Sequence, residues 1–157
     1  IRYAAVLLNY AEAMYELGTT GKALDDALNI SLNLVRLRVN PDMPKLTTSF
    51  VSENNLNMRE EIRRERTIEV YNEGFRIDDL KRWNTAIVEM PKPILGVKWT
   101  GTDFATSWAG ASNMAKDSDG CLILENSRRW GSKNDLYPLP VDQCQLNPNL
   151  GQNPGWQ

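Results

Sequence analysis

Histidine is absent from the sequence, and cysteine occurs only twice in 157 residues. Without histidine the chain cannot form a Ser-His-Asp triad, and it lacks the usual general base and the commonest metal ligand. Cys121 and Cys144 are too few and too far apart for a zinc site. They are compatible with a disulfide in an oxidising compartment or with two buried free thiols. We expect no catalytic residue, no metal site and no cofactor.

Long apolar runs and a strong net charge are also absent. No run approaches the roughly 18 residues that a membrane-spanning helix needs. The net charge of −2 gives no reason to expect nucleic acid as a partner, because binding nucleic acid requires a basic face. The length suits one domain, and 41% hydrophobic with 24% charged residues is typical of a globular protein. The chain opens at Ile1 inside a helical pattern, without a methionine or a cap. We therefore expect the C-terminal part of a longer protein, with any export signal or lipid anchor outside it.

The first forty or so residues predict two helices that fold back on each other. Residues 1–17 are almost all apolar apart from one narrow polar stripe, which predicts a helix packed on most of its sides. Gly18 is placed to end that helix, and a second helix is predicted over residues 21–39, before Pro41. This helix-turn-helix resembles a tetratricopeptide repeat. The polar stripe consists of Arg2, Asn9, Glu12 and Glu16.

The next helical region runs from Met58 to Trp83. It follows a linker, residues 41–55, that is rich in Pro, Thr, Ser and Asn and is expected on the surface. We expect an Asn or Ser near residues 52–55 to cap the helix that follows. Gly74 divides the region into two helical segments, and we expect it to act as a left-handed C-terminal cap.

Three glutamates in this region, Glu65, Glu69 and Glu73, repeat every four residues and line one face of a helix. One hypothesis is a structural salt-bridge network, since Arg66 and Arg76 lie within reach of these carboxylates. The other is the acid and base of a glycosidase, which needs two carboxyl groups facing each other across a cleft at roughly 5–10 Å. Because glutamates stacked along one helix do not flank a substrate, the network is favoured.

The character of the chain changes in residues 84–157, which hold six of the eight prolines and seven of the ten glycines. Continuous helix is not expected there. Cys121–Glu125 is apolar enough for a short strand, which we expect to pair with residues 128–130 in a hairpin. Residues 117–120 match the start of a calcium loop, but wrong ligand types follow, so a plain turn is favoured. We expect a helical scaffold, residues 1–83, with the loop-rich region packed on it as one structural unit.

Three stretches carry a family resemblance. They are IRYAAVLLNYAEAMYEL at the start, ERTIEV with EGFRIDDLKRW in the centre, and DLYPLP with NPNLGQNPGW near the end. Together they resemble the SusD/RagB family of surface glycan-binding lipoproteins. The central block is similar to that family's ERxxEL…EGxRxxDLxRW signature and departs from it at Val70, where leucine is usual.

This resemblance implies a mainly α fold, with tetratricopeptide-like antiparallel helix pairs followed by an irregular, loop-rich region with a short β-hairpin. It also implies a protein that is not an enzyme and is lipid-anchored at the cell surface of the outer membrane. Family members bind oligo- or polysaccharide and deliver it to a SusC-like TonB-dependent transporter. The resemblance therefore implies nutrient binding and polysaccharide uptake.

The candidate glycan-binding residues are tryptophans of the loop-rich region, Trp99, Trp108 and Trp130. Flat aromatic rings stack on the apolar faces of pyranose sugars, and polar side chains hydrogen-bond the hydroxyl groups. The polar candidates nearby in sequence are Asp103, Asn113 and Arg128.

Two tryptophans, Trp83 and Trp156, lie in structural motifs and are assigned to the core. Two other functions remain open beside glycan binding. The first is a helical-repeat scaffold for peptide binding or assembly, without affinity for glycans. The second is a carboxylate-based hydrolase, which would require Glu65, Glu69 or Glu73 for activity.

Overall fold

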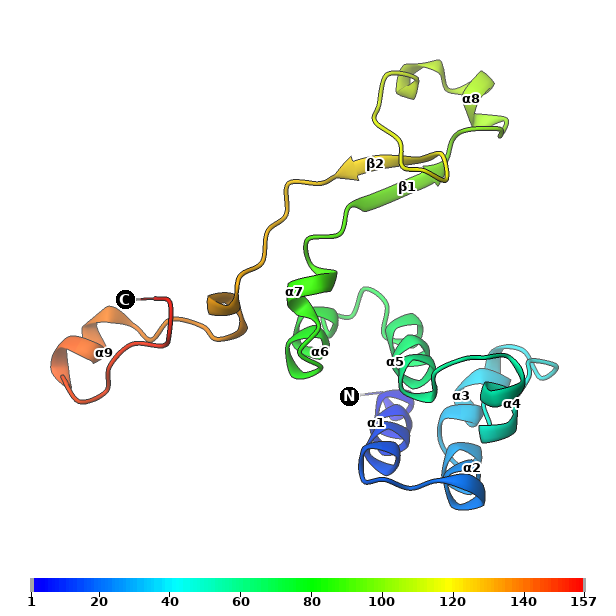
Figure 1. Ribbon diagram of the computed structural model, residues 1–157, viewed down its shortest axis with the longest axis horizontal. Helices are drawn as coiled ribbons and strands as arrows, with labels where there is room; N and C mark the ends of the chain where they lie inside the picture. The colour runs from blue at the N-terminus through cyan, green and yellow to red at the C-terminus, as the bar shows by residue number, and fades with distance from the viewer. Residues whose placement is uncertain (1, 157) are drawn as a thin grey trace. The chain divides into compact units, whose positions relative to one another are not determined.

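The computed structural model describes residues 2–156, and the chain forms two compact units, Ile1–Arg76 and Ile77–Gln157. Helices dominate, and the described residues contain one small antiparallel sheet, as predicted (Figure 1). The division at residue 83, with the second region packed on the first, stays a prediction. The helices described in the first unit are α1 (Tyr3–Glu16), α2 (Gly21–Asn29), α3 (Leu32–Val39), α4 (Thr48–Glu53) and α5 (Met58–Glu69).

The helix predicted over residues 21–39 is wrong as a single element, because it breaks between α2 and α3. Ser31 lies at the break, with φ −136° and ψ −98°. Its buried hydroxyl donates to the carbonyl oxygen of Ala27 at 2.6 Å. Such a bond competes with the backbone ladder of a helix and bends it. The linker prediction is also incomplete, because α4 lies within it.

The ends of α5 differ from expectation in position. The cap is Asn57, not a residue of 52–55: its side-chain oxygen accepts the backbone N–H of Glu60 at 3.3 Å. At the other end Gly74 does have the predicted left-handed backbone, with φ +82°. However, α5 already ends at Glu69, so Gly74 lies in the turn that leads to the next helix.

The core of the first unit is built mainly from leucines where the helices meet. The largest apolar side chains that are fully buried are Leu8, Leu28, Leu32, Leu46 and Ile62. Around them α1 makes its most extensive helix contacts with α5. In Figure 1 these two helices lie beside each other within the first unit. Burial of this apolar cluster is the main stabilising contribution to the unit.

Three residues of the polar stripe, Arg2, Asn9 and Glu16, are exposed to solvent and pair with residues of α5 or of the turn after it. The pairs join the two helices in antiparallel order and set charged groups against partners of opposite charge or a polar amide. On another face of α1, Tyr3, Val6 and Tyr10 are exposed, so the prediction of packing on most sides is wrong. The pairs are Arg2 with Glu69 (2.7 Å) and Glu73 (2.5 Å), Asn9 with Arg66 (2.8 Å), and Glu16 with Arg59 (2.8 Å).

The second unit contains short elements joined by irregular chain. Its central feature is the antiparallel pair β1–β2, with Leu95 opposite Ile123 and Lys98 opposite Cys121. The elements are α6 (Arg76–Arg82), which begins at the boundary, α7 (Ala86–Glu89), β1 (Ile94–Lys98), α8 (Phe104–Ser107), the 3-10 turn η1 (Ala109–Ala111), β2 (Cys121–Glu125), the 3-10 turn η2 (Ser132–Asp135) and α9 (Val141–Leu146).

The strand predicted over Cys121–Glu125 is confirmed, but its predicted partner is wrong. Residues 128–130 form no strand, and β2 pairs with β1 instead. The β1 sequence ILGVK offers apolar side chains to lie across from those of β2. Arg128 has a different role: its guanidinium donates to the carbonyl oxygen of Lys92.

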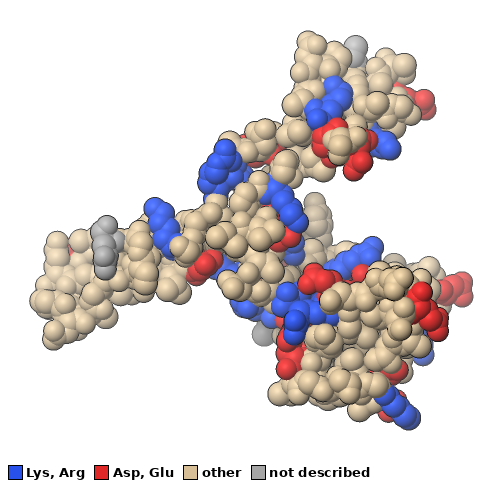
Figure 2. Space-filling view, viewed as in Figure 1, with Lys and Arg blue, Asp and Glu red and all other residues tan. Residues whose placement is uncertain are grey.

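Charges are mixed on the visible surface. Figure 2 shows Lys and Arg interspersed with Asp and Glu on the viewed face, with no extended patch of one sign. This distribution agrees with the small net charge. Among the described residues, no helix combines the length and the apolar character that crossing a membrane requires.

Candidate functional site

Trp99 follows β1 directly and is buried, with only 5% of its surface exposed. It packs with Ala111 and Leu122 in a small core of the second unit. The ammonium group of Lys116 lies 5.8 Å from the centre of its ring. Because its ring is covered by these neighbours, Trp99 supports the loop between the two strands and presents no open face for stacking.

The backbone of Gly120 closes the loop between β1 and β2. Its carbonyl oxygen accepts the N–H groups of Trp99 at 2.8 Å and Thr100 at 3.1 Å. Gly120 has φ +80°, and a Cβ atom added there would lie 2.5 Å from the Cβ of Thr100. Only glycine fits both the backbone conformation and the space.

The acidic run before β2 forms the predicted turn. One carboxylate oxygen of Asp117 accepts the backbone N–H of Asp119 at 3.0 Å and of Cys121 at 2.8 Å. This is the pattern of an Asx turn. Across residues 2–156 no group of three or more potential metal-ligating side chains is found. Cys121 and Cys144 are both free and half-buried.

Trp108 lies at the C-terminal end of α8 and is 59% exposed. The short helix that positions it is held by Thr106 and Ser107, whose hydroxyls donate to the carbonyl oxygen of Asp103 at 2.9 and 2.7 Å. Within the described residues, the indole N–H of Trp108 and the side chains of Asp103 and Asn113 have no hydrogen-bond partner. These groups remain available to a ligand.

A cavity of about 610 Å³ lies against Trp108, between the strands and the loop that joins them. We call it the Trp108 cavity. Its volume falls within the roughly 300–1,000 Å³ range of small-ligand sites. Besides two glycines, it is lined by Val97 of β1, Leu122 and Leu124 of β2, and Trp108, Ala111 and Met114 of the connecting loop.

Trp130 is half-buried and already engaged by protein groups. The ammonium group of Lys81 lies 5.6 Å from its ring centre and 3.9 Å from that of Tyr137. Its indole N–H donates to a carboxylate oxygen of Asp135 at 2.9 Å. These contacts tie α6 to the chain around η2, so Trp130 is less free than Trp108 to stack on a ligand.

The two tryptophans assigned to the core, Trp83 and Trp156, are half-buried instead. The indole N–H of Trp156 donates to the carbonyl oxygens of Lys133 at 2.7 Å and Leu136 at 3.0 Å. These bonds hold the end of the chain on η2 and leave part of the ring exposed, as is common for an amphipathic side chain.

All three glutamates of the central block are engaged in ion pairs, which confirms the salt-bridge network. Glu69 pairs with Arg2 at 2.7 Å and with Arg38 at 3.1 Å, and Glu73 also pairs with Arg2. The sequence did not indicate these cations, because they come from the start of the chain and from α3. The pairs between these arginines and the glutamates could be identified only once the packing of α1, α3 and α5 was known.

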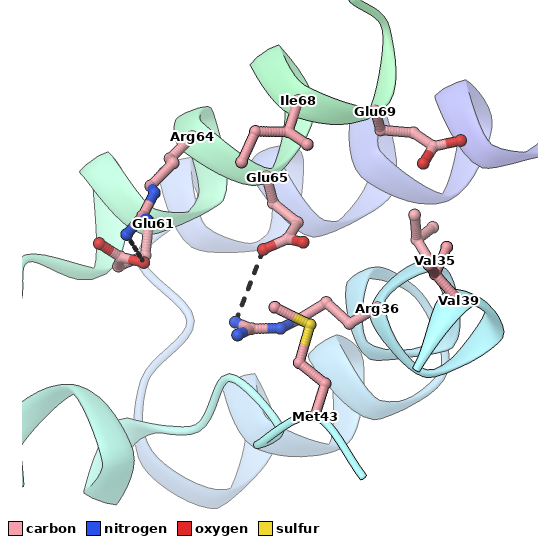
Figure 3. A pocket seen from close by; sticks show the side chains of 9 residues that line it. All are labelled: Val35, Arg36, Val39, Met43, Glu61, Arg64, Glu65, Ile68 and Glu69. Carbon is pink, nitrogen blue, oxygen red and sulfur yellow. Dashed lines mark hydrogen bonds and ion pairs between the residues drawn. The ribbon is translucent and has the colours of Figure 1, made fainter. Parts of the chain in front are cut away.

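Glu65 pairs with Arg36 across a smaller cavity of about 260 Å³ between α3 and α5 (Figure 3). The nearest atoms are 3.6 Å apart, and the two side chains are 14% and 7% exposed. Burial raises the pKa of the Glu65 carboxyl, and the opposing effect of Arg36 is smaller. Nε and Nη1 of Arg36 are buried without a hydrogen-bond partner among the described residues.

The model of the SusD family matches residues 1–156. The chain belongs to the SusD family. No curated protein matches the sequence.

Solved structures of SusD-like proteins share the fold. A SusD-like protein from Bacteroides fragilis is 28% identical, with a TM-score of 0.66, over 99% of this chain and 25% of that one. The protein BT4246 is 26% identical, with a TM-score of 0.70, over 99% of this chain and 23% of that one. The chain therefore spans about a quarter of the length of the structures that it matches.

The candidate tryptophans were predicted from residue type alone, and the apolar lining of the Trp108 cavity was not predicted. The sequence of Cys121–Glu125 did indicate part of this lining, because side chains alternate along a strand and Leu122 and Leu124 therefore lie on the same face. Met114 carried no such signal. It enters the cavity only because of how the loop between the strands folds back.

Proposed function

We propose that the protein containing this chain captures oligo- or polysaccharide at the cell surface and delivers it to a SusC-like TonB-dependent transporter. A lipid anchor in the outer membrane, outside this chain, would hold it there. Membership of the SusD family supports this proposal. Binding would occur without turnover of the glycan.

The observation that carries the proposal within this chain is the exposed ring of Trp108 beside its cavity. An indole ring offers a flat apolar face to a pyranose, and its N–H can donate to a sugar oxygen. Asp103 and Asn113 lie in the same loop, and their side chains have no hydrogen-bond partner among the described residues. We therefore place the glycan contact of this chain at Trp108, with Trp130 as a secondary candidate and Trp99 as its structural support.

The ion pairs of the central block support binding over hydrolysis. A glycosidase needs one carboxylic acid and one carboxylate on opposite sides of the scissile bond. Glu65, Glu69 and Glu73 all lie on or just after α5, and each pairs with an arginine. These glutamates are therefore occupied in joining the helices of the first unit.

Affinity electrophoresis of this chain against a panel of neutral polysaccharides tests the proposal. We expect retardation by at least one polymer. Aromatic stacking contributes roughly 0.5–1.5 kcal/mol, so Trp108→Ala should weaken binding about two- to tenfold. Trp83→Ala is the matched control and should leave retardation unchanged. Retardation that Trp108→Ala does not alter would contradict the placement of the site.

The exposed face of α1 favours a second candidate, a scaffold for assembly. Tyr3, Val6 and Tyr10 form an apolar stripe at helical spacing. An amphipathic helix of a partner protein could pack against such a face. Absence of binding to every polysaccharide, together with binding to a partner that Tyr10→Glu abolishes, would favour this function.

A further inference from the structure

The Trp108 cavity offers a ligand apolar surface and almost no hydrogen-bonding side chains. Among the described lining residues none is charged, and the indole N–H is the single polar side-chain group. The remaining side chains are those of Val97, Ala111, Met114, Leu122 and Leu124.

Hydroxyl groups of a sugar are poorly suited to this lining. A hydroxyl that leaves water without gaining a hydrogen-bond partner loses free energy, and an ionised uronate or sulfate loses much more. A methyl group gains affinity when it leaves water, by about fourfold for each one fully buried. The neutral, apolar lining therefore complements sugars with neutral apolar substituents.

We propose that the Trp108 cavity selects glycans whose sugars carry methyl-bearing substituents. These are O-acetyl groups or the C6 methyl group of a 6-deoxy sugar. The substituent enters the cavity while the ring of Trp108, which lines it, stacks on the sugar. This inference rests on the proposed function, because it assigns a substrate class to the same site.

Matched ligands test the proposal and separate the two sources of the methyl group. One pair is acetylated galactoglucomannan and the same polymer after alkaline deacetylation, titrated into this chain by calorimetry. The other pair is methyl L-fucoside and methyl L-galactoside, used as competitors, which differ only in the hydroxyl at C6. We expect at least one pair to show a preference of about fourfold or more for the methyl-bearing member.

Two substitutions connect the preference to the cavity. Val97→Thr and Met114→Gln introduce polar atoms with little change in side-chain size, at positions that are partly exposed. Both should reduce the preference toward equal binding and retain affinity for the unsubstituted ligand. Val88→Thr, on α7 and outside the cavity, is the control and should keep the preference.

The outcomes separate this inference from the proposed function. If both members of each pair bind equally and Trp108→Ala still weakens their binding, the proposed substrate class is overturned. The proposal that the chain binds glycan at Trp108 would then still stand. A preference that survives both Val97→Thr and Met114→Gln would overturn the assignment to the cavity. Failure to bind any polysaccharide would overturn the proposed function as well.

Discussion

Glu65 makes the stability of the first unit depend on pH. Burial raises the pKa of its carboxyl above the usual 4.5, and the effect of Arg36 does not reverse this. The folded state therefore holds the proton more tightly than the unfolded state does. The contribution to stability is fully present below about pH 4.5 and is lost as the pH rises through the folded-state pKa.

Glu65→Gln should remove this dependence. Relative to that variant, the unsubstituted chain should lose free energy of unfolding as the pH rises from about 4.5 through the raised folded-state pKa of Glu65, measured by urea unfolding and circular dichroism. Glu125→Gln is a control of opposite sign. Hydrogen bonds from Ser127 lower the pKa of Glu125, so its contribution is lost as the pH falls. Parallel profiles for Glu65→Gln and the unsubstituted chain would disprove the assignment.

The tryptophans illustrate the limit of residue identity as a guide. Trp99, Trp108 and Trp130 are the same residue type in the same loop-rich region, so the sequence predicted all three equally as glycan-binding residues. Their surroundings differ because Trp99 follows directly on β1 and is enclosed, whereas Trp108 follows a four-residue helix and is exposed. Exposure depends on this loop path, which local sequence patterns do not encode.

At the scale of elements, the β1–β2 hairpin depends on Gly120. Gly120→Ala forces an L side chain into left-handed geometry, which costs about 1–2 kcal/mol, and adds a clash with Thr100. We expect at least that loss in the free energy of unfolding of the second unit, followed by tryptophan fluorescence in urea. Gly110→Ala is the control, because a Cβ there meets no atom within 4 Å. Equal stability of the two variants would contradict the role of Gly120.

Helices were more predictable than their boundaries and partners. The apolar periodicity of residues 1–17 predicted α1 well, and the pattern of residues 58–83, divided at Gly74, predicted α5 and α6 without their exact ends. The break at Ser31 was not predictable from periodicity, because the apolar pattern continues through it and a single side-chain hydrogen bond decides it. The partner of β2 was missed because strand pairing across the loop from Trp99 to Gly120 depends on that loop's closure.

At the scale of the whole molecule, the first unit depends on buried contacts of α5. Arg66 is buried, donates to Asn9 at 2.8 Å and lies over the ring of Phe75. Arg66→Met should lower the free energy of unfolding by about 1.5–3 kcal/mol, the usual worth of a hydrogen bond to a charged group. Arg64→Met, on the same helix but exposed, should change it by less than about 0.5 kcal/mol. Urea unfolding of both variants measures this, and similar losses would contradict it.

Family and fold class were accessible from the sequence because the motifs at its start, centre and end are spread over the chain. The chain passes from the first compact unit to the second between residues 76 and 77, at the start of α6. Composition changes only after Trp83, so it gave no sign of this earlier boundary. Only the tryptophan of the candidate site could be predicted from the sequence. The cavity beside it could not, because two strands and a loop together form it.

The pairing of α1 with α5 also bears on how the chain selects among its own helices during folding. Residues 2, 9 and 16 of the first helix meet residues 73, 66 and 59, so both sets follow a heptad spacing in opposite directions. Sliding either helix by one turn would separate Arg59 from Glu16 and leave buried Arg66 without Asn9. An apolar stripe alone could pack against many helices in many registers. The polar pairs between α1 and α5 disfavour other registers, because those registers leave polar groups without partners. The pairs made by Arg59, Arg66 and Glu73 thus favour one register of α1 against α5.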